Sequence, residues 1–325
     1  MAKRSKAAVP AYRRRRTRGS LLGGIFGWIV RIVLAFILLS LLWVLAYRFI
    51  NPPITITMAG DMLAGRGAAR DWMPITKIDR DMVRAAIAAE DGKFCQHNGF
   101  DFEAIEDAMK RNASGGRIRG GSTISQQTAK NAFLWQGGGY VRKGFEAWFT
   151  FLMEHMYPKR RIMELYLNLA ETGIGTYGAN AGSQRYFGHD ADAMSATEAA
   201  RIAAVLPLPK ERGAIAPKGF TRRYGNTIAA RIGAVGRDGL DSCVYRGIAA
   251  PPSKAPPRVT TKPRPLPGEE YETDKPPPPP TEETSVEPPG EVVEPPPAEN
   301  LPVTNLPENS VETTPPPEPD VPNSF

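Results

Sequence analysis

The sequence predicts an all-α, mainly helical domain with one transmembrane helix before it and a disordered, proline-rich tail after it. Between residues 51 and 246, several segments carry apolar side chains at helical spacing, and little of this region alternates apolar and polar residues as half-buried strands do. An apolar run with a single charge precedes these segments, and 24 of the 32 prolines follow residue 250. These patterns divide the chain into an arm, an anchor, a helical body and a tail.

Charge follows the same division. Residues 1–20 carry eight Lys or Arg and no acid, whereas residues 251–325 carry fourteen acidic and five basic side chains. The whole chain has a net charge of +7, which leaves +8 for residues 21–250. A basic body is typical of proteins that bind an anionic partner, such as nucleic acid, anionic lipid or a phosphate-bearing substrate. Charge alone does not choose among these partners.

Residues 21–50 form the predicted membrane anchor, behind a basic arm over residues 1–20. Crossing a bilayer takes roughly 20 apolar residues, and Arg31 is the one charge inside this long apolar run. The positive arm predicts a cytoplasmic N-terminus, with the body on the other side of the membrane. A cleaved signal peptide is the alternative, but the run is long for one and no clear cleavage site follows it. Interfacial residues are expected at the far end, namely Trp43, Tyr47 and Arg48.

Capping residues mark the starts of the predicted helices in the body, residues 51–246. Asp79 and Ser122 are placed to cap two of them, Pro158 suits the first turn of another, and Ser195 with Glu198 forms a capping-box pattern. The helices are predicted over residues 79–91, 101–111, 122–135, 140–157, 158–168 and 195–206.

The tail, residues 247–325, is too rich in proline and acid to bury an apolar core, so we expect it to be disordered and extended. It serves either as a spacer, as a link across part of the cell envelope, or as a source of polyproline II ligands. The two cysteines, Cys95 and Cys243, allow one intramolecular disulfide outside the cytoplasm; two free thiols are the equal alternative.

The first polar cluster stands where an apolar helical run ends in two adjacent acids, Glu90 and Asp91, followed by Phe94 and His97. Such a pair is either a solvated helix end or a catalytic acid or base at the edge of a cleft. The second cluster follows Gly-Gly at residues 120–121. Its members, Thr123, Gln127 and Lys130, fall at helical spacing and are expected to share one polar face. The helix start there suits an anion, although the spacing is not that of a P-loop.

The third cluster contains Arg142, Lys143 and Glu146 within one helical turn, and Lys159 opens a fourth. A surface ion pair between Arg142 and Glu146 is the plain alternative. The three histidines show no metal-ligand spacing. Two carboxylates among Lys and Arg side chains suit sugar transfer from a sugar phosphate.

Four segments resemble the successive motifs of the peptidoglycan glycosyltransferases, the family of the monofunctional biosynthetic transglycosylases and of the polymerase domains of class A penicillin-binding proteins. They are EDGKFCQHNGFD, GGSTISQQTAKN, RKGFEA and KRRIMELYLN, and the resemblance covers about residues 51–209. It implies a lysozyme-like helical fold and lipid II polymerisation by inverting β-1,4 transfer to the GlcNAc 4-hydroxyl. It also implies an enzyme of the bacterial inner membrane, with its catalytic domain in the periplasm and no transpeptidase module.

The resemblance also implies residue roles. Glu90 corresponds to the general base and Glu146 to a second essential carboxylate on the pyrophosphate side. Donor-side contacts are expected from Thr123, Gln127, Lys130, Arg142, Lys143 and Lys159, and support for the base from Asp91, Phe94 and His97. No tightly bound cofactor is expected, and a divalent cation, Mg²⁺ or Mn²⁺, is left open at Glu146. Expected partners are lipid II, the nascent glycan, membrane lipid and other cell-wall synthesis or division proteins, with no nucleic acid.

Two other functions are alternatives to this one. A lytic, lysozyme-like enzyme would share the helical fold and one acid, but a neutral glycan does not call for the clustered Lys, Arg and Gln side chains. A non-catalytic envelope scaffold would use the anchor and the tail, but it predicts decay of the motif residues, which are intact here.

Overall fold

The helical prediction is confirmed by a computed structural model, which describes residues 19–114 and 121–251, with side chains from residue 23. The basic arm and nearly all of the tail lie outside the described residues. The elements of the described part are α1 (Gly19–Phe49), α2 (Ile56–Leu63), β1 (Ala69–Arg70), α3 (Arg80–Glu90), α4 (Phe102–Ala113), α5 (Ile124–Phe133), α6 (Gly139–Met156), α7 (Lys159–Leu169), β2 (Glu171–Gly173), β3 (Thr176–Tyr177), α8 (Ala179–Phe187), a 3₁₀ turn (Ala191–Ala193), α9 (Ala196–Val205), α10 (Gly219–Arg237) and α11 (Ser242–Tyr245).

The helix starts follow the capping residues, with one shift. Asp79 accepts the amide N–H of Asp81 at 2.9 Å at the start of α3, and the capping box of Ser195 and Glu198 opens α9. The expected cap at Ser122 is wrong by one residue. Thr123 caps α5 instead, because its hydroxyl meets the N–H of Gln126 while the Gln126 side chain accepts the N–H of Thr123.

A small three-stranded sheet in the described part was not predicted. In it β3 lies between β1, which runs parallel to it, and β2, which runs antiparallel. Strands of two or three residues are too short to display an alternating pattern, so sequence periodicity does not indicate them. The buried Asp61 carboxylate ties α2 to this sheet. It accepts the Tyr177 hydroxyl at 2.5 Å and the Lys210 ammonium at 2.9 Å.

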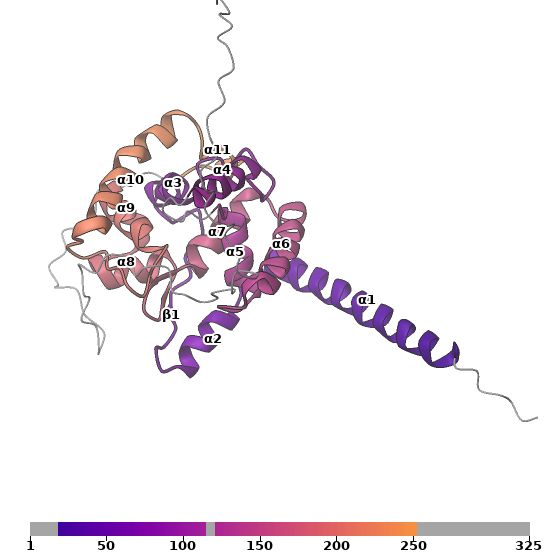
Figure 1. The fold of residues 1–325 in the computed structure, drawn as a ribbon. Coiled ribbons are helices and arrows are strands. Elements are labelled where there is room, and N and C mark those ends of the chain that lie inside the picture. The colour runs from indigo at the N-terminus through magenta and orange to yellow at the C-terminus, as the bar shows by residue number, and fades with distance from the viewer. Residues whose placement is uncertain (1–18, 115–120, 252–325) are drawn as a thin grey trace, which may run out of the picture. The chain divides into compact units, whose positions relative to one another are not determined.

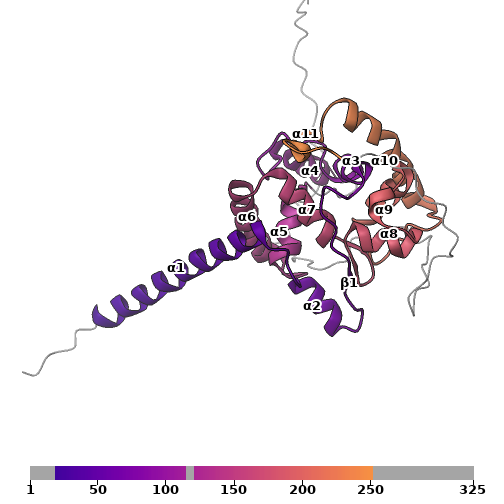
Figure 2. The same cartoon turned by 180° about the vertical axis from the view of Figure 1, so that it is seen from behind.

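Helix α1 contains a 27-residue apolar stretch, Gly23–Phe49. Among the described residues, α1 is the one helix long and apolar enough to cross a membrane. It extends from the side of the body where α6 lies (Figures 1 and 2). Phe36 packs on Phe145 of α6, with ring centroids 5.7 Å apart, and the Trp148 indole N–H donates to the Ser40 hydroxyl at 3.1 Å. The anchor is therefore joined to α6 by specific side-chain contacts.

The C-terminal end of α1 is fastened to the body. The Arg161 guanidinium donates to the carbonyls of Tyr47 and Ile50 at about 3 Å, and so satisfies two of the carbonyls that a helix end leaves free. Trp43 and Tyr47 each place their rings 5.4 Å from Phe133 of α5. The aromatic pair expected at the membrane interface thus also docks the anchor onto the helical body.

The core surrounds α3, α5 and α7. Helix α5 packs between α6 and α7, while α3 packs against α9 and α10. The two groups lie on different sides of the described body, with α9 and α10 away from α1 (Figures 1 and 2). Largely buried positions on these helices include Met82, Ile87, Ile124, Phe133, Tyr166 and Ile202. This packing sets the C-terminal end of α3 beside the polar face of α5.

Candidate active site

Glu90 is the last residue of α3 and keeps partial exposure to solvent. The Gln127 amide nitrogen, on α5, donates to its carboxylate at 2.7 Å. Desolvation by the surrounding protein raises the pKa of Glu90 above the ordinary value of 4.5, against the lowering effect of that hydrogen bond. A carboxylate with a raised pKa and a fixed orientation is suited to accept a proton near neutral pH.

Asp91 and His97 hold the loop that follows Glu90. The buried Asp91 carboxylate accepts the Ile124 amide N–H at 2.9 Å, at the start of α5, and lies 2.9 Å from His97 Nε2. The Gly99 amide N–H donates to His97 Nδ1 at 3.1 Å, so the proton of a neutral ring lies on Nε2 and faces Asp91. The two side chains therefore position Glu90 and the second cluster relative to each other.

Thr123 belongs to the same network. Its hydroxyl donates to the Gly99 carbonyl at 2.6 Å, and the residue is only 3% exposed. Helical spacing predicted that Thr123 shares an open polar face with Gln127 and Lys130. This is wrong for its hydroxyl, which caps α5 and bonds to the Gly99 carbonyl. Gln127 and Lys130 remain on the face of α5 directed toward Glu90 and Glu146.

Glu146 on α6 has the opposite surroundings from Glu90. Arg142 donates to one carboxylate oxygen at 2.9 Å and the Lys143 ammonium forms a short ion pair with the other. Lys143 also donates to the Ser122 hydroxyl at 3.1 Å. Because Glu146 is only 3% exposed, the alternative of an ordinary surface ion pair does not describe it.

Lys130 connects the two carboxylates. Burial lowers its pKa, and the charges that act on it come, in order of size, from Glu146, Arg142, Lys143 and Glu90. No hydrogen-bond acceptor for its ammonium is present among residues 23–114 and 121–251. Lys130, Arg142, Lys143 and Glu146, hereafter the cation cluster, therefore offer a partly desolvated positive site beside Glu90.

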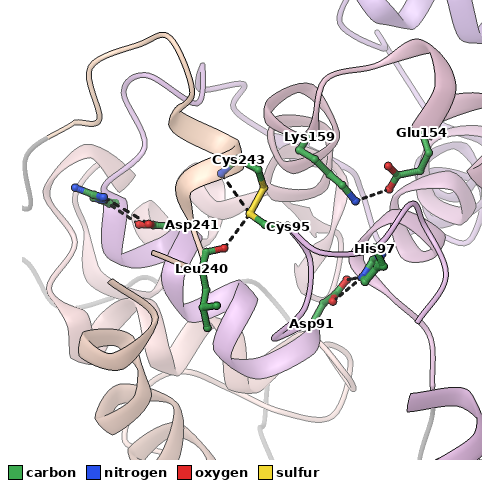
Figure 3. Close-up of a disulfide and its surroundings, with 9 residues drawn as sticks. Asp91, Cys95, His97, Glu154, Lys159, Leu240, Asp241 and Cys243 are labelled. Atoms are coloured by element: carbon green, nitrogen blue, oxygen red, sulfur yellow. Dashed lines mark hydrogen bonds and ion pairs between the residues drawn. A yellow bond between two sulfur atoms is a disulfide. The ribbon is translucent and has the colours of Figure 1, made fainter. Parts of the chain in front are cut away.

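Phe94 and Lys159 contact each other. The Lys159 ammonium is 4.6 Å from the Phe94 ring centroid and pairs with Glu154 at 2.8 Å. Figure 3 shows this pair, the contact of Asp91 with His97, and the disulfide between Cys95 and Cys243. The Cα atoms of the two cysteines are 5.5 Å apart, within the usual range for a disulfide. Of the two alternatives left open by the sequence, the structure has the disulfide.

Arg212 is a charged residue near Glu90 that the sequence patterns did not indicate. It lies in the loop between α9 and α10, and its guanidinium is one of the positive charges that lower the pKa of Glu90. Tyr224, on α10, was missed as well; its hydroxyl donates to the Ala89 carbonyl at 2.8 Å. Both follow the segment that carries the four motifs, so nothing in their local pattern marked them.

The residues around Glu146 do not fit a divalent cation. Its two oxygens face the cationic side chains of Arg142 and Lys143, and the described residues bring no three His, Cys, Asp or Glu side chains together as a ligand set. Positive charge at this carboxylate is supplied by the chain itself.

Comparison with known proteins bears on this arrangement. The family model for transglycosylases matches residues 58–232, which include both glutamates and the cation cluster. A biosynthetic peptidoglycan transglycosylase of Caulobacter vibrioides is 52% identical over 201 residues, covering 62% of this chain and 88% of the relative. Proteins with the same name from Xanthomonas oryzae pv. oryzae and Rhodospirillum centenum are each 46% identical, over 67% and 65% of this chain and 88% and 91% of their own lengths.

Proposed function

We propose that this chain, which belongs to the transglycosylase family and is a peptidoglycan glycosyltransferase, polymerises lipid II into glycan strands. The growing chain, linked to undecaprenyl pyrophosphate, is transferred to the GlcNAc 4-hydroxyl of an incoming lipid II, with inversion to a β-1,4 bond. The observation that carries the proposal is the placement of Glu90 and Glu146 around one partly buried lysine, Lys130.

In this proposal Glu90 is the general base. It takes the proton of the GlcNAc 4-hydroxyl as that oxygen bonds to the anomeric carbon of the terminal MurNAc. The bond from that carbon to the pyrophosphate oxygen breaks, and its electron pair leaves with the pyrophosphate. Gln127 fixes the orientation of the base, and the raised pKa of Glu90 improves its match to a hydroxyl proton near neutral pH.

The cation cluster is assigned to the leaving pyrophosphate. Lys130, Arg142 and Lys143 bring positive charge to one site, and the burial around Lys130 strengthens its stabilisation of developing negative charge relative to water. Glu146 holds Arg142 and Lys143 in place before the substrate arrives. Lys159 is assigned to the rim of the donor side, and Phe94, Asp91, His97 and Thr123 to support of the loop and of α5.

The anchor suits a substrate that lives in the membrane. Because α6 carries Arg142, Lys143 and Glu146 and also packs on α1, the site is held near the bilayer surface where lipid II is found. Confinement to one surface raises the effective concentration of substrate. The basic arm favours a cytoplasmic N-terminus, and the disulfide favours an oxidising periplasm for the catalytic domain. We assign no transpeptidase activity and no tightly bound cofactor.

The test is polymerisation of labelled lipid II by the full-length chain in detergent, with Glu90→Gln as the variant and Glu106→Gln, an exposed glutamate on α4, as the matched control. Wild type and control are expected to make long strands. The Glu90→Gln rate should fall by about 10²–10⁴-fold, the usual contribution of a general base. Strands from all three would remove Glu90 from its role. Cleavage of added glycan in place of synthesis would favour a lytic enzyme.

A further inference from the structure

Arg212 is held in a defined position near the base without being part of the cation cluster. One of its guanidinium nitrogens donates to the Ala204 carbonyl at 3.1 Å, near the end of α9, and the guanidinium carbon lies 5.0 Å from the Phe220 ring centroid. An arginine stacked on an aromatic ring and hydrogen-bonded to backbone has lost much of its rotamer freedom before any ligand binds.

A continuous set of contacts leads from Arg212 to Glu90. Phe220 stacks on Tyr224 with ring centroids 5.7 Å apart, and the Tyr224 hydroxyl donates to the carbonyl of Ala89, the residue before Glu90. The guanidinium is also close enough to Glu90 to favour its charged form. Arg212, Phe220 and Tyr224 therefore form one wall that ends at the catalytic glutamate.

This wall approaches Glu90 from a different side than the cation cluster. Lys130 and Glu146 stand on α5 and α6, which pack on each other, whereas Arg212 precedes α10, which packs on α3 and α9. Helices α9 and α10 lie on the side of the described body away from α1 and α6 (Figures 1 and 2). Glu90 therefore lies near two cationic groups from different parts of the fold: Lys130 on α5, and Arg212 in the loop between α9 and α10.

The reaction uses two anionic substrates, a donor and an acceptor. If the proposed function holds, on which this inference rests, the donor loses its pyrophosphate at the cation cluster while the acceptor presents a hydroxyl to Glu90. The acceptor keeps its own pyrophosphate and the carboxylates of its peptide throughout the step. We propose that Arg212 binds an oxyanion of the acceptor, phosphate or carboxylate, and so places the acceptor hydroxyl at Glu90. A guanidinium suits either group, because its parallel N–H bonds match two oxygens.

The experiment separates the two substrates. The donor is lipid II with its GlcNAc 4-hydroxyl capped, and the acceptor is a lipid II analogue in which a methylene replaces the anomeric oxygen, so each molecule plays a single part and one tetrasaccharide forms. The variant is Arg212→Met in the full-length chain. The control is Arg222→Met, an exposed arginine in the first turn of α10.

Arg212→Met should raise the KM for the acceptor by about tenfold or more, the usual loss for a charge-assisted hydrogen bond, while the donor KM stays within about twofold. The unchanged donor KM also shows that the variant folds. Arg212→Lys should recover part of the loss, since it restores charge without the planar fork. Repeating the assay with an acceptor whose peptide carboxylates are amidated assigns the oxyanion: a persisting Arg212 effect identifies phosphate, and a vanished effect identifies carboxylate.

Three results would overturn the inference: an unchanged acceptor KM, an equal rise in both KM values, or a shift of the pH profile alone. The last would mean that Arg212 acts only through the Glu90 carboxylate. These results are distinct from failure of the proposed function, because in that case wild type and Arg222→Met would also form no tetrasaccharide.

Discussion

Glu90 and Glu146 flank the same lysine, yet the protein treats the two carboxylates in opposite ways. Glu90 accepts one neutral amide, from Gln127, and desolvation raises its pKa. Glu146 is nearly inaccessible and is paired by Arg142 and Lys143. Environment therefore separates the two carboxylates: desolvation favours the protonated form of Glu90, whereas the ion pairs of Glu146 hold Arg142 and Lys143 in place.

The largest expected effect on stability comes from removing the disulfide that tethers the loop after Glu90. The Cys95–Cys243 disulfide joins the loop after Glu90 to α11 across 148 residues. Replacing both cysteines by alanine should lower the free energy of unfolding by about 4 kcal/mol, because the unfolded chain loses a long-range constraint. Thermal unfolding with and without reductant measures this. Identical midpoints for the oxidised wild type and the double variant would show that the bond does not stabilise the attachment of this loop to α11.

Glu146→Gln is expected to give the next largest loss of stability and tests the cation cluster. Removing this charge leaves Arg142, Lys143 and Lys130 facing one another without their buried counter-charge. Breaking a fully buried pair costs about 3–5 kcal/mol, and because the Lys143 side chain is 43% exposed we expect about 2 kcal/mol. Denaturant unfolding beside Glu106→Gln checks the value. Unfolding indistinguishable from that control would refute the organising role of Glu146.

Glu90→Gln should change stability in the opposite direction, by about 1 kcal/mol. The folded-state pKa of Glu90 lies above its unfolded value, so the folded chain holds this proton more tightly and stability falls as pH rises through the raised pKa. Glutamine does not ionise and still accepts the Gln127 amide. The variant should therefore unfold at a higher temperature than wild type at pH 8, and the gain should shrink toward pH 4. A loss of stability at pH 8 would contradict the assigned environment.

Sequence patterns predicted those features of this arrangement that have a local signal in the sequence. Asp79 and Ser195 marked helix starts through their capping chemistry, and the order of the four motifs placed Glu90, Lys130 and Glu146 in one site. What they could not predict depends on tertiary contacts. The sheet strands are too short for a periodic pattern, and Arg212 comes near Glu90 through the packing of α9 and α10 on α3. The prediction that Thr123 presents its hydroxyl on an open polar face was wrong, because helical spacing does not reveal which residue uses its side chain as the cap.

The pH dependence of a single transfer tests the assignment of the base most directly. The rate of tetrasaccharide formation at saturating substrates is measured from pH 4 to pH 9 for wild type, Glu146→Gln and Glu90→Gln. Because the base must be ionised, wild type and Glu146→Gln should lose rate as pH falls, with an apparent pKa above the ordinary glutamate value of 4.5. The residual rate of Glu90→Gln should show no such acid limb. An acid limb that persists unchanged in Glu90→Gln would assign the base to another residue.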